Sequence, residues 1–138
     1  MREQADAAAA LKWTVRIEAT TRVRSRWYVS YLWLFAVWQL VLVPAVLLWH
    51  GPTGALVSAL VNALVVMGLS LFATRQPVIP HGYGGLHFKV IGAWAAAYVL
   101  ALVLGFTVFV DSVAFAAVAA LACALPASAA AWREARAA

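Results

Sequence analysis

The residues with potential for metal chemistry in this sequence are two histidines near its middle. His81 and His87 lie six residues apart in the segment RQPVIPHGYGGLHFK. A closed tetrahedral metal site needs four ligands, and residues 75–89 contain no cysteine, aspartate or glutamate to complete one. We therefore predict no metal site and no cofactor in this segment.

Three neutral polar residues, Gln39, Asn62 and Tyr98, interrupt long hydrophobic runs. Gln39 lies twelve residues before Gly51 and Asn62 eleven after it, so a tight turn at Gly51 would bring both amides to the same depth. A buried amide without a partner costs several kcal/mol. We expect both amides to face the protein interior and to hydrogen-bond across the hairpin or through a neighbour. Alternatively, the three residues line a small polar pocket, as in transporters.

No catalytic residues are evident. The middle of each hydrophobic run lacks Asp, Glu, Lys and Arg, and no nucleophile lies beside a base at one depth. The single cysteine, Cys123, reads as a small buried or lipid-facing residue. Asp111 and Ser112 are typical of a helix N-cap, with ion binding by Asp111 as the alternative. The sequence therefore does not predict an enzyme.

The elements that must position these residues are four hydrophobic runs. The 138-residue chain is 66% hydrophobic and only 11% charged, far from the balance of soluble domains. Each run is near the ~20 residues that cross a bilayer as a helix. The runs are residues 28–49, 53–73, 88–110 and 112–132. We predict an all-α integral membrane protein, an antiparallel bundle of four transmembrane helices.

The remaining chain consists of a basic N-terminal segment 1–27, a hinge 74–87 and a tail 133–138. Every Lys and Arg falls in or beside these three parts, on one side of a four-span topology. The positive-inside rule then places both termini and the hinge in the cytoplasm, and we expect a bacterial plasma (inner) membrane. Because this rule accounts for the net charge of +5, we expect no nucleic-acid partner.

The structure of segment 1–27 stays open between a helix, a strand and disorder. Its alanine-rich start favours a helix, whereas the alternation of polar and apolar residues over 12–19 is typical of a strand. Four arginines of this segment could bind anionic lipid headgroups or serve only to orient the protein. They are Arg16, Arg22, Arg24 and Arg26.

Small residues at a spacing of four predict helix-packing faces, because they let helices approach closely in lipid. One such row lies in run 88–110 and comprises Ala93, Ala97, Ala101 and Gly105. A second row, in run 53–73, comprises Gly54, Ser58, Asn62 and Ser70 and is interrupted by Val66. Run 112–132 is so rich in alanine that we expect it to need close helix neighbours rather than free lipid.

For function, the sequence favours a non-enzymatic interaction, regulatory or scaffold subunit that works through helix packing. Its partners would be membrane lipids and either another protein or a second copy of the chain. The alternative is a small transporter or channel that works as a homo-oligomer with a neutral polar site at the midplane. No motif identifies a substrate.

Overall fold

The computed structural model describes residues 1–77 and 82–137, with only the backbone described for residues 21–25. The described chain is helical apart from its short connections. Its helices are α1 (Arg2–Leu48), α2 (Pro52–Thr74), α3 (Tyr83–Thr107) and α4 (Val113–Ala137). Each contains a stretch long and apolar enough to cross a membrane, beginning at Arg26 in α1. The prediction of an all-helical chain with four potential membrane spans is confirmed.

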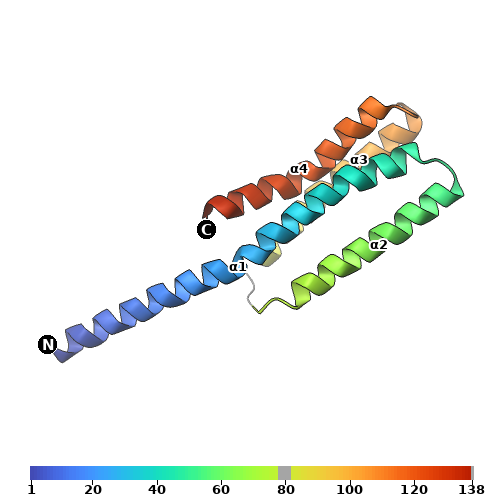
Figure 1. Ribbon diagram of the computed structural model, residues 1–138. Helices are drawn as coiled ribbons and strands as arrows, with labels where there is room; N and C mark the ends of the chain where they lie inside the picture. Colours follow the sequence, from blue (N-terminus) through green and yellow to red (C-terminus); the bar gives the residue numbers. More distant parts are fainter. Residues whose placement is uncertain (78–81, 138) are drawn as a thin grey trace.

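The first helix joins the N-terminal segment to the first span without a break. α1 runs from Arg2 to Leu48, and its first half projects beyond the other helices (Figure 1). Residues 12–19 are therefore helical and do not form the strand that their alternating pattern suggested. On a helix, Leu11 and Val15 share one face while Trp13 and Ile17 share the opposite face, so strict alternation does not require a strand.

The tightest packing joins α1 to α4, which runs back along it (Figure 1). The contacting face of α4 is a row of small buried residues that we name the alanine stripe. It consists of Ala116, Ala119, Ala120, Cys123, Ala124, Ala127, Ala130 and Ala131. Residues at these three- and four-residue intervals lie on one helix face, and their small size lets the two backbones come close. The expectation that this span needs helix neighbours is thereby met.

Two clusters of buried residues fill the interior, one at each end of the helical region. The end where α1 enters and α4 finishes is the basic end, and the end with the two tight turns is the turn end. At the basic end, Tyr28, Leu32 and Phe35 pack with the alanine stripe. At the turn end, Val43 and Leu47 pack with the stripe and with α3. The core thus lies among α1, α3 and α4.

Helix α2 lies on the flank of this core. Among the described helices it packs closely only against α1, and Figure 1 shows it set apart from α3 and α4. Its buried residues are Gly54, Ser58 and Leu69. A Cβ on Gly54 would collide with the carbonyl oxygen of Trp49, so glycine is needed where α2 leaves the turn. The tight turn predicted at Gly51 is present: Gly51 has φ +97°, which glycine adopts without strain, and Pro52 begins α2.

Two predicted boundaries are wrong. The connection between α2 and α3 spans residues 75–82 rather than 74–87, because α3 begins at Tyr83 and ends at Thr107. Tyr83 and Leu86, expected in the hinge, pack against the basic-end cluster, which extends α3 toward its N-terminus. The segment expected as a tail after residue 132 continues α4 to Ala137.

Candidate interaction site

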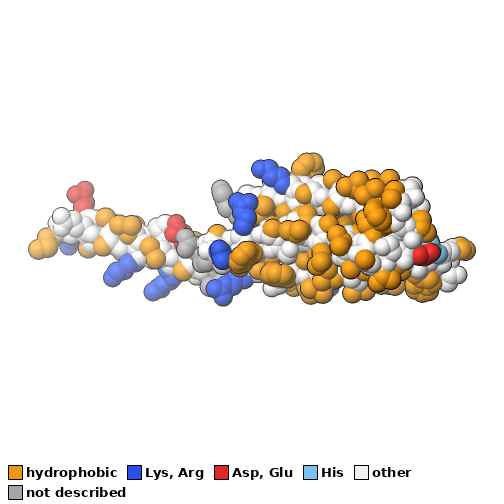
Figure 2. All heavy atoms as spheres, turned by 90° about the horizontal axis from the view of Figure 1, so that it is seen from above, with side chains coloured by type: hydrophobic (Ala, Val, Ile, Leu, Met, Phe, Trp, Pro, Cys, Tyr) orange, Lys and Arg blue, Asp and Glu red, His pale blue; other side chains and the backbone are white. Residues whose placement is uncertain are grey.

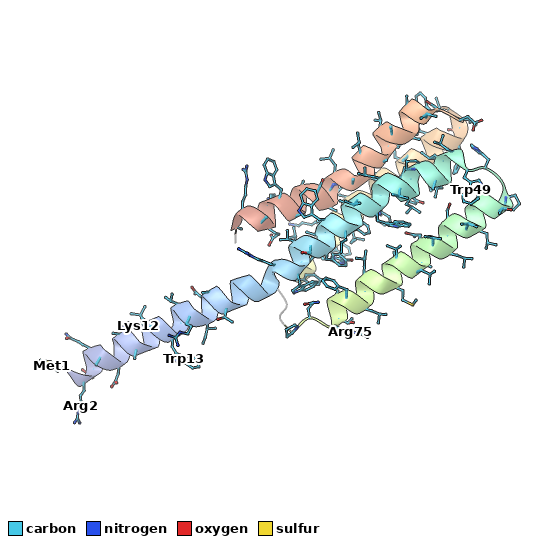
Figure 3. The ribbon with its side chains drawn as sticks, in the orientation of Figure 1. Met1, Arg2, Lys12, Trp13, Trp49 and Arg75 are labelled. Atoms are coloured by element: carbon cyan, nitrogen blue, oxygen red, sulfur yellow. The ribbon has the colours of Figure 1, made fainter. Side chains whose placement is uncertain are left out.

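The charged side chains separate the two ends of the helical region. Figure 2 shows hydrophobic side chains covering the body, whereas Lys and Arg gather at one end and along the projecting part of α1. Labelled positions in Figure 3 agree, since Arg2, Lys12 and Arg75 lie toward this end and Trp49 lies at the other. The structure therefore groups the basic residues on one side of an apolar body.

Gln39 is fully buried and lacks a polar partner. Its side chain is 0% exposed, and neither its Oε1 nor its Nε2 has a hydrogen-bond partner among the described residues. On α1 it shares a face with Ala36 and Val43, which belong to the two clusters packed against the alanine stripe. Because alanine side chains offer no polar atoms, the amide is enclosed without a partner, and a stability penalty of about 1–3 kcal/mol follows.

Asn62 does not bond to Gln39. Its Oδ1 instead accepts a hydrogen bond from Nε1 of Trp38 at 3.0 Å, across the hairpin of α1 and α2. Trp38 and Gln39 are consecutive, so they point about 100° apart on the helix, one toward α2 and the other toward α4. The sequence predicted a common depth for Gln39 and Asn62. It did not predict that the indole N–H of Trp38 would be the donor to Asn62.

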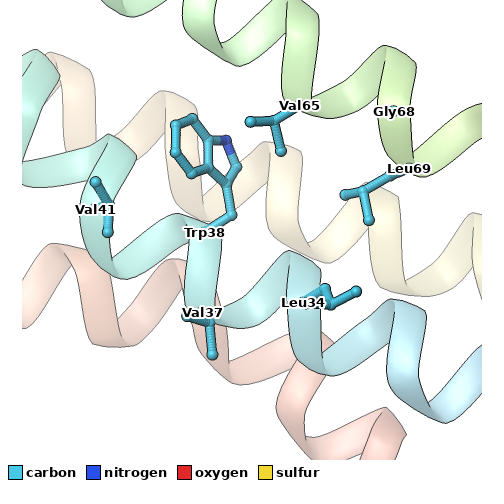
Figure 4. A pocket seen from close by; sticks show the side chains of 7 residues that line it. All are labelled: Leu34, Val37, Trp38, Val41, Val65, Gly68 and Leu69. Carbon is cyan, nitrogen blue, oxygen red and sulfur yellow. The ribbon is translucent and has the colours of Figure 1, made fainter.

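A groove lies beside Trp38, between α1 and α2. Figure 4 shows the indole reaching from α1 toward Val65, with Leu69 and Gly68 farther along α2. The groove has a volume of about 380 Å³, and its lining is almost entirely apolar. The lining residues are Leu34, Val37, Trp38, Val41, Val65, Gly68 and Leu69. The bulky indole of Trp38 lies between α1 and α2, and the groove is the space that remains beside the ring.

The small residues of α2 divide between two faces. Gly54, Ser58 and Asn62, from the row noted in the sequence, face α1, whereas Ser70 is exposed and bonds to the carbonyl of Val66. A second row is exposed: Ala55, Ala59 and Ala63 stand four residues apart. Open space surrounds the Cα of Gly68, since a Cβ built there would meet no atom within 4 Å. This exposed row was not singled out in the sequence.

The small residues expected as a packing face of α3 are distributed unevenly. Ala101 and Gly105 are buried, Ala97 is half-buried and Ala93 is exposed. A Cβ on Gly105 would lie 2.5 Å from Cδ2 of Leu47, so this glycine allows α3 to approach α1 closely at the turn end. The third midplane residue, Tyr98, is half-buried and packs beside the turn-end cluster. None of Gln39, Asn62 and Tyr98 lines either of the two grooves described for this structure.

An aromatic cluster at the basic end was also missed by the sequence analysis. The rings of Tyr83 and His87 stack at 5.1 Å, and Tyr28 meets Tyr83 edge-on at 4.9 Å. Tyr31 stacks on Tyr28 at 6.1 Å. The Tyr28 hydroxyl and Nδ1 of His87 are buried without a hydrogen-bond partner among the described residues. The placement of Tyr83 and His87 in α3, rather than in the hinge, creates this cluster.

The N-terminal arginines lie along the projecting part of α1. Arg16 and Arg26 are exposed, and the side chains of Arg22 and Arg24 lie outside the described residues. Ten residues of helix separate Arg16 from Arg26, a distance of ~15 Å. Because this exceeds the ~8–10 Å over which salt screens a charge, Arg16 is poorly placed for headgroups that contact Arg26.

The two turns meet at the turn end. Nδ1 of His50 lies 3.2 Å from Oδ1 of Asp111, which links the α1–α2 turn to the α3–α4 turn. Ser112 caps α4, because its hydroxyl accepts a hydrogen bond from the backbone N–H of Phe115 at 3.2 Å. The predicted cap therefore belongs to Ser112, and Asp111, at φ 60°, contacts His50 instead.

These features define a helical chain whose apolar body can cross a membrane and whose polar groups are scattered rather than convergent. His81, one of the two histidines considered for a metal site, lies outside the described residues, and the described part holds no group of three or more His, Cys, Asp or Glu side chains that could bind a metal. The chain matches no known protein family, no curated protein and no solved structure.

Proposed function

We propose that this chain is a non-enzymatic integral membrane protein that acts as an interaction, regulatory or scaffold subunit through helix packing. Its first partner in this proposal is a second copy of the chain. The observation that carries the proposal is the position of α2, which packs closely only against α1 and leaves small residues uncovered.

The physics of helix association in lipid supports this role for α2. Lipid tails are as apolar as leucine, so helices associate through close packing and polar contacts rather than through the hydrophobic effect. The exposed row Ala55, Ala59 and Ala63 permits such close approach. The groove beside Trp38 leaves about 380 Å³ of further apolar space next to α2, on a different side from the row. A helix from a second copy would cover the row.

The proposed topology is an antiparallel helix bundle in a bacterial plasma membrane. The grouping of Lys and Arg at the basic end supports cytoplasmic placement of both termini and of the α2–α3 connection. The projecting part of α1 then extends into the cytoplasm as a helix. It has Leu11 and Val15 on one face and Trp13 on the opposite face, all exposed, which suits contact with a cytoplasmic protein.

Cysteine cross-linking tests the self-association directly. The single native cysteine, Cys123, is buried in the alanine stripe, so Cys123→Ala gives a suitable background. In that background we expect Ala59→Cys to form a disulfide-linked dimer upon oxidation in membranes. Val118→Cys is the control, because Val118 is exposed on α4, away from the proposed contact. Equal cross-linking of the two variants, or none at Ala59→Cys, would contradict the proposal.

A flux measurement separates this role from that of a transporter or channel. We expect liposomes containing the protein to show no flux of protons or potassium ions above protein-free liposomes. If the protein conducts, and Gln39→Leu and Asn62→Leu abolish the flux while assembly persists, the interaction role is wrong. The complete burial of Gln39, whose amide lies in no described groove, argues for the interaction role.

A further inference from the structure

A second groove, separate from the one beside Trp38, lies between α1 and the outer face of α4. Its lining consists of Trp33 from α1 and Leu125, Ser128, Ala129 and Trp132 from α4. The groove has a volume of about 480 Å³ and an almost wholly apolar surface. Such a volume is within the range of small-molecule sites, which is about 300–1,000 Å³.

The floor of this groove offers no free hydrogen-bond donor from Ser128. Its hydroxyl donates to the carbonyl oxygens of Ala124 and Leu125, at 3.0 and 3.1 Å. Ala129 adds only a small side chain to the lining, whereas Trp33 and Trp132 add large apolar surfaces. An occupant of this groove would therefore be recognised by its shape and by apolar contact, as a hydrocarbon chain would be.

The guanidinium group of Arg136 lies at the basic end of the groove. Arg136 lies four residues after Trp132 on the same face of α4, and its Cζ is 4.1 Å from the centroid of the indole ring. This cation–π contact holds the guanidinium above the groove while its N–H groups remain available. Arg133 is also exposed there, whereas Glu134 is partly buried. The mouth of the groove is therefore positively charged.

The length of this arrangement matches one leaflet of a bilayer. Eleven residues of helix separate Leu125 from Arg136, which corresponds to ~16 Å along α4. Half of a hydrocarbon core of ~30 Å is ~15 Å. The apolar lining covers about 10 Å of this length, from Leu125 to Trp132, and Arg136 follows one helical turn later. This is the order of groups in a phospholipid, with an acyl chain followed by a phosphate.

We propose that this groove binds one anionic phospholipid of the basic-end leaflet. An acyl chain lies between Trp33 and Trp132, and the phosphate accepts hydrogen bonds from Arg136. The positive charge at the groove mouth favours a lipid with net negative charge over a zwitterionic one. The proposal depends on the four helices crossing a membrane and is independent of the proposed self-association through α2.

Native mass spectrometry of the full chain in a non-ionic detergent tests this site. The probes are phosphatidylglycerol and phosphatidylcholine with identical acyl chains. We expect the protein to retain one phosphatidylglycerol in preference to phosphatidylcholine. Arg136→Gln should reduce this preference about fivefold, the effect of one basic group near a lipid phosphate. Ala129→Leu should reduce retention of both lipids, because it fills the floor of the groove.

Matched controls make each outcome decisive. Arg75→Gln removes the same charge from an exposed residue at the end of α2, and Ala117→Leu enlarges an exposed alanine of α4 that lies nearer the turn end and outside the groove lining. Both should bind lipid as the unmodified chain does. Equal losses in Arg136→Gln and Arg75→Gln would indicate diffuse attraction and overturn the site. Unchanged lipid binding in Ala129→Leu would also overturn the site. The same holds for an Ala129→Cys cross-link between two copies in the Cys123→Ala background, because a second chain would then occupy the groove.

Discussion

Helices α2 and α4 have similar lengths and comparable hydropathy but opposite environments. Both are long and apolar enough to cross a membrane. α4 buries its alanine stripe against α1 and α3, whereas α2 buries only Gly54, Ser58 and Leu69 among its described residues. Their difference shows that hydropathy does not identify the buried helix of a membrane protein.

Residue size accounts for the difference better than polarity does. Along the stripe of α4, every side chain is alanine or cysteine, so α1 can approach closely along the full contact. On the α1–α2 side, the indole of Trp38 stands between the helices and leaves a groove (Figure 4). α4 is therefore fixed within one chain, while α2 keeps most of its surface uncovered.

The largest test of this comparison is to enlarge an alanine of the stripe. Ala127 is 0% exposed, so Ala127→Leu should overpack the α1–α4 contact and lower the free energy of unfolding by about 3 kcal/mol. Denaturation in detergent, followed by tryptophan fluorescence, measures the loss. Ala117→Leu on an exposed face of α4 should change stability by less than about 0.5 kcal/mol. Similar stability of the two variants would show that the stripe is not a close contact.

A smaller effect is expected from two glycines of α2. Gly54→Ala should lower the unfolding free energy by about 2 kcal/mol, because its Cβ would collide with the Trp49 carbonyl and lie 2.8 Å from Cγ of Trp49. Gly68→Ala should raise it by about 0.5–1 kcal/mol, since the site is open and alanine favours a helix. Thermal unfolding of the two variants measures both signs. A loss of stability in Gly68→Ala would place a close neighbour at that position.

These contacts separate what the sequence could predict from what it could not. The four spans, the turn at Gly51 and the need of the last span for neighbours all follow from hydrophobic length, turn residues and alanine content. The sequence did not predict the start of α3. Tyr83 and Leu86 stand in a glycine-rich segment typical of a hinge, and only their packing against the basic-end cluster shows that they belong to the helix. Local composition does not contain that tertiary information.

The hydrogen-bond partners of the buried polar residues could not be predicted from the sequence either. Counting residues from Gly51 gave the depth of Gln39 and Asn62, but not the rotation of α1 about its axis. That rotation is set by packing against the alanine stripe, which turns Gln39 toward α4 and Trp38 toward α2. Partner choice among polar groups within a helix bundle therefore depends on packing, which a single sequence does not specify.

Replacing Gln39 and replacing Asn62 should change the unfolding free energy in opposite directions. Gln39→Leu removes two buried polar atoms that have no hydrogen-bond partner in the described part of the chain, so it should raise the unfolding free energy by about 1 kcal/mol. Asn62→Leu removes the acceptor for Trp38 and should lower it by about 0.6 kcal/mol. Denaturant titration in detergent measures both changes. A destabilised Gln39→Leu would mean that the glutamine has a polar partner within the core.

The smallest effect is expected at the turn end, between His50 and Asp111. Both side chains are exposed, so His50→Ala should lower the unfolding free energy by less than about 0.5 kcal/mol. Asp111→Gly loses the same contact but relieves a positive φ of 60°, which glycine adopts without strain. Its stability should therefore equal or exceed that of His50→Ala in the same thermal assay. If Asp111→Gly were instead the less stable variant, the aspartate would stabilise the turn through more than its contact with His50, and the turn end would contribute to holding α2 beside the core.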